Sequence, residues 1–278
     1  MTDYVGGPRL DMNDGLVIPQ IGYGVFKVED DVAEHSVVDA LEAGYRHIDT
    51  AAIYQNERGV GAALKASGLP REEIFVTTKL WNTDQAPDAA WPALHKSLDL
   101  LGLEYVDLYL IHWPSPWRGN FLAAWETLIE MREKGLVKSI GVSNFEEEHL
   151  TEIISATGVT PAVNQIELHP YLQQESLSEI DAKHGILTEA WSPLGQGQAL
   201  EDAVLSSIAL KHNVSTAQVI IRWHVQSGRI VIPKSVTTSR IQSNIDVFGF
   251  ELDQDDLAAI KTLNTDSRIG PDPRTADF

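Results

Sequence analysis

Apolar and polar positions along the chain follow two alternating patterns, and these patterns predict the order of the elements. Short runs rich in Val, Ile and Leu are typical of buried strands, and each is followed by the i, i+3, i+4 spacing of a helix. The expected strands are 21–25, 45–48, 74–79, 106–112, 137–142, 163–166, 186–190 and 230–232. The expected helices are 31–43, 56–67, 87–101, 121–134, 146–156, 173–184, 200–212, 215–227 and 239–247.

Eight strand–helix alternations with short links predict an α/β fold of the (β/α)₈ TIM-barrel type, built as one domain over residues 1–278. An antiparallel hairpin of residues 9–12 and 16–18 is expected to cap one end, and a helix at 255–263 and an irregular tail at 264–278 follow the barrel. An open doubly wound sheet would also alternate. It ranks second because no G-x-G-x-x-G follows any strand, and Gly195-Gln-Gly197 fails that pattern.

Polar side chains stand where the predicted strands end. Asp49 follows the second strand, with Tyr54 five residues on, while Lys79 and His112 end the third and fourth. Later strands end in the same way, at Ser143-Asn144, Gln165, Trp191-Ser192 and Lys234-Ser235. Active sites of such barrels form at the carboxyl ends of the strands, so these side chains are expected to share one site.

Four of these groups suit proton transfer. A tyrosine has an ordinary pKa near ~10, and a nearby ammonium is expected to lower the pKa of Tyr54. Asp49 would keep Lys79 charged, and the His112 imidazole could orient a substrate oxygen. Such a set can protonate an oxyanion that develops as hydride adds to a carbonyl carbon. Taken singly, each residue has an ordinary structural role, and only the joint arrangement favours catalysis.

Composition narrows the classes of function. With 21 basic and 40 acidic residues the net charge is −19, which argues against nucleic acid and anionic membranes as partners. The absence of cysteine excludes a disulfide framework, a thiolate metal site and a Cys nucleophile, and no metal site is expected. The first residues lack the layout of a signal peptide, and no apolar run approaches the ~20 residues of a membrane span, so a cytoplasmic location is expected.

Long ordered motifs carry a resemblance to a known family. They are GYRHIDTAAIYQNERGVG at 44–61, KSIGVSNF at 138–145 and IPKSVTTSRIQSN at 232–244, with TTKLWN, YLIHWP, AVNQIELHP and WSPLGQG between them. Along nearly its whole length the sequence resembles the aldo-keto reductases, and among them bacterial 2,5-diketo-D-gluconic acid reductase-like members.

The resemblance implies roles for individual positions. Asp49, Tyr54, Lys79 and His112 match the catalytic tetrad, with Tyr54 as the acid. Residues that match the family's cofactor contacts are Ser143, Asn144 and Gln165 for the nicotinamide carboxamide, Trp191 for the ring, Ser192, Leu194, Gly195 and Gln196 for the pyrophosphate, Lys234, Ser235 and Arg240 for the 2′-phosphate, and Asn244 for the adenine. Val236 is a further expected cofactor contact. The implied cofactor is NADPH. Many relatives carry Glu where this chain has Ser243, so that adenine contact is not carried over.

Substrate and partners follow from the same resemblance. Phe26, Trp81, Trp113 and also Trp117 are expected to wall a pocket for small aldehydes, ketones, keto sugars or keto acids. The stretch 197–200 is short, so pockets rather than a closing strap are expected to hold the cofactor. No obligate protein partner is evident, and the family default is a monomer. Two alternatives remain: an NADPH-binding regulatory or redox-sensing subunit with little turnover, and a Schiff-base lyase that uses Lys79.

Overall fold

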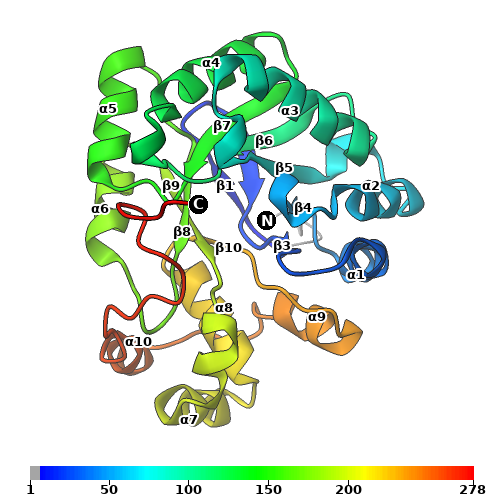
Figure 1. Ribbon diagram of the computed structural model, residues 1–278. Helices are drawn as coiled ribbons and strands as arrows, with labels where there is room; N and C mark the ends of the chain where they lie inside the picture. The colour runs from blue at the N-terminus through cyan, green and yellow to red at the C-terminus, as the bar shows by residue number, and fades with distance from the viewer. Residues whose placement is uncertain (1–6) are drawn as a thin grey trace.

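The computed structural model describes residues 7–278, and within them the predicted parallel strands close into a barrel (Figure 1). The strands are β3 (Tyr23–Gly24), β4 (His47–Asp49), β5 (Phe75–Leu80), β6 (Val106–Ile111), β7 (Val137–Ser143), β8 (Val163–Glu167), β9 (Leu187–Trp191) and β10 (Ile230–Val231). Neighbours in sequence pair in parallel, and Ile21 bridges Val231 to join the two edges. The predicted (β/α)₈ fold is therefore confirmed, and the alternative prediction of an open doubly wound sheet is wrong.

Helices surround the barrel on its outer face (Figure 1). They are α1 (Asp30–Glu42), α2 (Glu57–Ala66), α3 (Pro87–Leu101), α4 (Phe121–Glu133), α5 (Glu147–Thr157), α6 (Glu175–Lys183), α7 (Ala203–His212), α8 (Thr216–Gln226), α9 (Thr238–Ile245) and α10 (Gln254–Lys261). Local sequence sets their starts. Ser215 and Gln218 form a reciprocal capping box before α8, and Pro87 stands in the first turn of α3, where its missing N–H costs nothing.

The predicted hairpin is confirmed as β1 (Arg9–Asp11) and β2 (Val17–Pro19), an antiparallel pair. Its side chains Met12 and Ile18 pack on Phe75, which begins β5, and on neighbouring strand residues of the barrel. Asp14 also accepts a 2.6 Å hydrogen bond from Ser139 Oγ on β7. The hairpin therefore covers the end of the barrel where the strands begin, and the opposite end is left for a site.

Most predicted bounds differ from the observed ones by one to three residues, and two of these differences have a clear local reason. The helix expected at 200–212 begins at Ala203, because the Asp202 carboxylate caps the N–H groups of Val204 and Leu205. The preceding 3₁₀ segment, Gly195–Glu201, contains Gln196 and Gly197 with positive φ. Asp49 lies inside β4 rather than after it, because its backbone pairs with Thr77 of β5.

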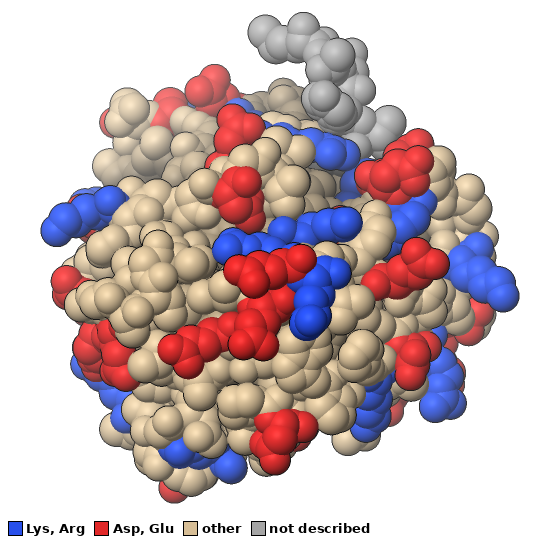
Figure 2. Space-filling view, turned by 90° about the horizontal axis from the view of Figure 1, so that it is seen from above, with Lys and Arg blue, Asp and Glu red and all other residues tan. Residues whose placement is uncertain are grey.

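The tail at 264–278 has neither helix nor strand, as expected, but its path is informative. It leaves α10 and crosses the open end of the barrel, and its last residues lie over the centre of the fold (red in Figure 1). No helix in residues 7–278 combines the length and hydropathy needed to cross a bilayer. On the face drawn in Figure 2, acidic and basic side chains are interspersed.

Candidate active site

A cavity of about 1030 Å³ opens at the carboxyl ends of the strands. It is bordered by three of the four predicted catalytic side chains, Asp49, Tyr54 and His112, while Lys79 lies fully buried beside Asp49. The other predicted residues on its wall are Phe26, Trp81, Trp113, Ser143, Asn144, Gln165, Trp191, Ser192, Leu194, Gln196, Lys234, Ser235, Arg240 and Asn244. Gly195 and Val236 do not border it.

Tyr54 is placed by a firmly held loop after β4. A 3₁₀ turn, Ala52–Tyr54, ends at Gln55, whose φ of 58° lies in the left-handed region and turns the chain back. The buried Asn56 side chain then donates to the carbonyl oxygens of Val25 and Val28, at 2.9 Å each. These bonds tie the loop to the segment after β3, so the phenol is held beside the cavity.

Asp49 and Lys79 form a buried ion pair. The Lys79 Nζ lies 2.6 Å from Asp49 Oδ1 and donates a second hydrogen bond, of 2.8 Å, to the Thr50 carbonyl oxygen. Burial by itself lowers the pKa of Lys79, but the charge of Asp49, its hydrogen bond to Lys79 and the nearby Tyr54 and Glu189 together outweigh it, and the pKa is raised. The ammonium is therefore charged at neutral pH.

The Tyr54 phenol stands next to this ammonium, with Nζ of Lys79 5.1 Å from the ring centroid. Burial raises the pKa of Tyr54, while the charge and hydrogen bonding of Lys79 lower it. The net shift is upward, so the expectation of a lowered pKa was wrong. The reason is that removing the phenolate from water costs more than the neighbouring ammonium returns.

His112 faces Tyr54 across the same corner. The two ring centroids lie 5.6 Å apart, and the Trp81 ring lies 5.1 Å from the imidazole on another side. Burial, helped by the charge of Lys79, puts the pKa of His112 well below its ordinary value. The imidazole is therefore neutral, with one N–H to donate.

A hydrogen-bonded chain links the ion pair to the aromatic wall of the cavity. Gln165 Nε2 donates to Asp49 Oδ2 at 2.8 Å, and Ser143 Oγ donates to the Gln165 carbonyl oxygen at 2.7 Å. Asn144 Nδ2 donates to Ser143 Oγ at 3.1 Å, and Trp191 Nε1 donates to Asn144 Oδ1 at 2.9 Å. These four side chains, drawn from three neighbouring strands and the loop after β7, are thus fixed relative to the tetrad.

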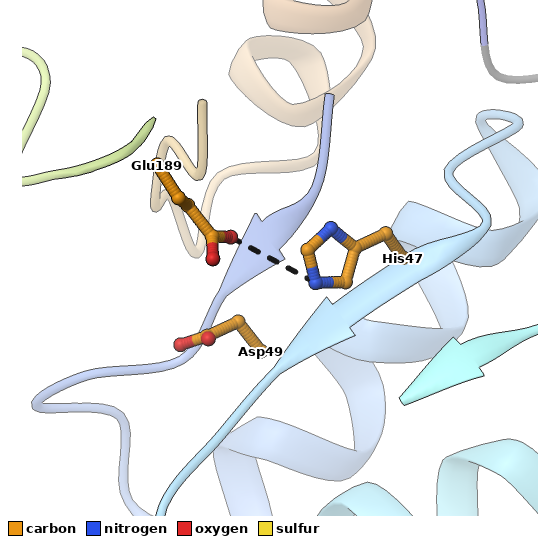
Figure 3. A group of neighbouring side chains, drawn as sticks. All are labelled: His47, Asp49 and Glu189. Carbon is orange, nitrogen blue, oxygen red and sulfur yellow. Dashed lines mark ion pairs between the residues drawn. The ribbon is translucent and has the colours of Figure 1, made fainter. Parts of the chain in front are cut away.

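The barrel interior holds a cluster of three polar side chains that the sequence did not suggest. His47, Asp49 and Glu189 point toward one another from β4 and β9 (Figure 3), with His47 Nε2 3.9 Å from Glu189 Oε1. Among residues 7–278, neither Glu189 oxygen has a hydrogen-bond partner. Burial and the charge of Asp49 raise the pKa of Glu189 to about 8, and burial with the charge of Lys79 lowers that of His47 to about 3. Both are therefore neutral at pH 7.

The far end of the cavity is exposed and cationic. Lys234 lies in the loop after β10 and Arg240 lies in the first turn of α9, and both are exposed to solvent. Among the described residues, neither forms an ion pair. The start of α8, residues 215–217, also lines the cavity, which the sequence analysis missed. The capping box of Ser215 and Gln218 marked that helix start and is the signal that could have suggested it.

The aromatic wall contains a residue that the sequence analysis did not assign. Phe278 stacks on Trp81 with centroids 5.8 Å apart and meets the edge of Trp113 at 5.2 Å. It follows an irregular stretch, so no pattern placed it here. Trp117 was wrongly expected in the wall. It is 52% exposed, and its indole N–H donates to the Ala276 carbonyl oxygen at 2.8 Å.

Comparisons with known proteins agree with this geometry. Residues 20–265 match the aldo/keto reductase family. An aldo-keto reductase of Mycolicibacterium smegmatis is 55% identical over 271 residues, which cover 98% of both chains. Methylglyoxal reductase DkgA of Escherichia coli K12 is 50% identical over 266 residues, which cover 95% of this chain and 96% of that protein.

Solved structures give the same result. A mutant of Gox0644, crystallised in complex with NADPH, matches with a TM-score of 0.94 at 50% identity and covers 98% of this chain and 99% of its own. An aldo-keto reductase of Bombyx mori in complex with NADP matches with a TM-score of 0.89 at 40% identity, over 96% of each chain. On these matches, the chain belongs to the aldo/keto reductase family of NADPH-dependent oxidoreductases.

Proposed function

We propose that the protein reduces small carbonyl compounds to alcohols, with Tyr54 as the proton donor. The observation that carries the proposal is the buried ion pair of Asp49 and Lys79, which lies next to a phenol at the wall of a large cavity. A buried pair of this kind is costly unless it is well bonded, and here both partners are. It holds one positive charge beside the phenolic group, where negative charge develops on proton loss.

The cavity residues suit NADPH. The volume of the cavity, about 1030 Å³, is at the upper end for ligand sites and leaves space for a carbonyl compound beside a dinucleotide. Ser143, Asn144 and Gln165 offer the hydroxyl and amide groups that a carboxamide needs, and Trp191 offers a flat ring. Lys234 and Arg240 supply charge for the 2′-phosphate. NADPH, when bound, supplies the hydride.

Three properties of the tetrad support proton donation by Tyr54. The raised pKa of Tyr54 keeps its proton in place at neutral pH, so the acid is present. The Lys79 ammonium stabilises the phenolate that forms when the proton leaves. The neutral His112 can donate its N–H to the same substrate oxygen and so orient the carbonyl toward Tyr54.

The wall of the cavity supports a small or aromatic substrate. Phe26, Trp81 and Trp113 present apolar faces near Tyr54, and the rings of Phe26 and Tyr54 lie 5.1 Å apart. Relatives at 50% identity are named methylglyoxal reductase. We therefore expect glyoxals and aldehydes to be substrates, with diketo sugar acids and other ketones as further members of the class.

The test is an assay of NADPH oxidation over a panel of carbonyl compounds, with the Tyr54→Phe variant beside the wild type. Tyr54→Phe removes the proton and keeps the ring, so turnover should fall by roughly 10²–10⁴-fold while NADPH binding persists. Full activity in that variant would remove Tyr54 from its role. No oxidation with any carbonyl would favour the regulatory alternative.

The Schiff-base alternative is less well supported. A lysine nucleophile must lose its proton, and here Asp49 raises the pKa of Lys79 and holds its Nζ at 2.6 Å. Borohydride in the presence of a carbonyl compound should therefore leave Lys79 unmodified. A trapped adduct on Lys79 would revive the lyase.

A further inference from the structure

Glu167 is a buried carboxylate for which the proposed chemistry has no use. It ends β8, two residues after Gln165, and is inaccessible to solvent, yet it does not border the cavity. It belongs to the AVNQIELHP stretch, of which only Gln165 was given a role. A buried charge is retained only when other groups satisfy it, so its partners indicate what it does.

Three donors satisfy this carboxylate, and two of them belong to the tail. Oε1 accepts from the Ile269 N–H at 2.6 Å, and Oε2 accepts from the Gly270 N–H at 2.9 Å. The third contact, of 3.0 Å, joins Oε1 to His169 Nε2, which must donate because a carboxylate has no proton to give. Burial alone would raise the pKa of Glu167, but these hydrogen bonds outweigh it and lower the pKa. Glu167 is therefore ionised, and its hydrogen bonds are charge-assisted.

Gly270, one of the two tail residues bonded to Glu167, lies against Trp191, the residue proposed to stack on the nicotinamide. A Cβ placed on Gly270 would lie 2.6 Å from Trp191 Cη2 and 3.0 Å from Glu167 Oε2. The backbone of the tail is therefore wedged between the carboxylate and the indole. The next residue, Pro271, borders the cavity, and the tail continues to Phe278 on the aromatic wall.

At the chain end, the buried Asn82 amide donates to the Phe278 carbonyl oxygen at 3.2 Å. Two further polar contacts of the tail involve groups that are more open to solvent. Arg268 pairs with Glu146 at 3.2 Å, with both side chains about one fifth exposed, and Trp117, which bonds the Ala276 carbonyl, is 52% exposed. Water screens such partly exposed contacts more than it screens a buried, charge-assisted hydrogen bond. Glu167 therefore makes the buried, charge-assisted contact at the middle of the tail, where the tail crosses the barrel, whereas Asn82 holds its last residue.

We propose that Glu167 is a positioning residue, which fixes the tail of residues 268–278 against Trp191 and thereby sets both the nicotinamide shelf and the wall of the carbonyl pocket. The roles of Trp191 and of the carbonyl pocket rest on the proposed function. Glu167 acts through the backbone of the tail and touches neither substrate nor cofactor. On this proposal, one buried carboxylate sets the position of Trp191 relative to the wall of the carbonyl pocket.

The first test is Glu167→Gln, with Glu175→Gln as the matched control. Glutamine keeps the shape but has one accepting oxygen, so one tail N–H loses its acceptor. Hydrogen exchange of the Ile269 and Gly270 amides, measured without any ligand, should accelerate at least about tenfold. KM for the carbonyl substrate should rise about tenfold, with a smaller change in kcat. Glu175 is exposed and pairs with Lys261, and its variant should match the wild type in both readouts.

The second test approaches the same contact from the tail. Gly270→Ala forces the tail away from Trp191 and leaves the Glu167 carboxylate intact, so it should reproduce the rise in KM. Because both changes break one contact, the double variant should be little worse than either single one. Additive effects, or a Glu167→Gln protein with unchanged amide exchange and KM, would overturn the proposal.

The two proposals fail in different ways. If the wild type reduces no carbonyl compound while Glu167→Gln still frees the amides of the tail, the proposed function fails and the clamp stands as a structural contact only. If the wild type is active and the variant keeps a protected tail, the clamp fails and the proposed function is unaffected.

Discussion

The two ends of the cavity are built on opposite principles. At the tetrad end, Lys79 is fully buried, and Asp49 and Thr50 accept its hydrogen bonds at 2.6 and 2.8 Å. At the other end, Lys234 and Arg240 are exposed, and among the described residues neither has an ion-pair partner. Both ends place positive charge at or close to the cavity, but only at the tetrad end do protein groups already hold that charge in place.

The difference follows from what each charge is proposed to do. A group that stabilises a developing oxyanion must be in place before the reaction, because moving the group during the reaction would add to the activation free energy. A group that binds a phosphate can be ordered by the phosphate itself. We therefore expect substitutions at the tetrad end to affect both catalysis and folding, and substitutions at the far end to affect only the affinity for the cofactor.

The largest effect is expected from Lys79→Met. It removes the ammonium beside Tyr54 and leaves the Asp49 carboxylate buried without its charged partner. Turnover should fall by roughly 10²–10⁴-fold, and the free energy of unfolding should fall by about 3–5 kcal/mol. Steady-state kinetics and urea denaturation measure the two losses, and Lys96→Met, on an exposed helix face, is the control. A stable, active variant would contradict the preorganised tetrad.

A smaller effect is expected from Lys234→Met and Arg240→Gln. Each removes one charged contact to a phosphate, worth about 1.5–3 kcal/mol, so NADPH affinity should fall about tenfold or more for each. The affinity for NADH and the midpoint of urea unfolding should stay unchanged. Lys261→Met, on exposed α10, controls for the loss of a positive charge. Equal losses for NADPH and NADH would show that these cations do not recognise the 2′-phosphate.

The smallest effect is expected from Glu189→Gln, and it depends on pH. The folded pKa of Glu189 is about 8 against an ordinary 4.5, so the folded protein binds a proton that the unfolded chain has released. The associated stability is complete below pH ~4.5 and is lost as the pH rises toward ~8, by about 1.4 kcal/mol per pH unit. The variant has no such proton, so its stability should fall less between pH 6 and pH 7.

Urea unfolding at the two pH values measures this difference. Glu179→Gln is the matched control, because Glu179 is exposed on α6. Parallel pH profiles of the wild type and the Glu189→Gln variant would mean that Glu189 is ionised at neutral pH, which would contradict the neutral interior.

The sequence alone was enough for the fold and for grouping the four residues of the tetrad. Eight strand–helix repeats implied parallel strands, and parallel strands place the residues that follow them at one end of a barrel. Asp49, Tyr54, Lys79 and His112 could therefore be grouped without knowing any distance. The reasoning is local, because each residue needs only its position at the end of a strand or in the loop that follows it.

Tertiary structure alone decided the rest, because those features depend on contacts between distant parts of the chain. The direction of the Tyr54 pKa shift depends on how much water its neighbours exclude. The neutrality of Glu189 depends on burial and on the charge of Asp49, 140 positions away in the sequence. The tail has no periodicity, so the sequence pattern could not place it. In the structure Glu167, about 100 residues away, accepts hydrogen bonds from two of its N–H groups. Periodic patterns specify elements, whereas burial and long-range hydrogen bonds appear only once the elements are packed.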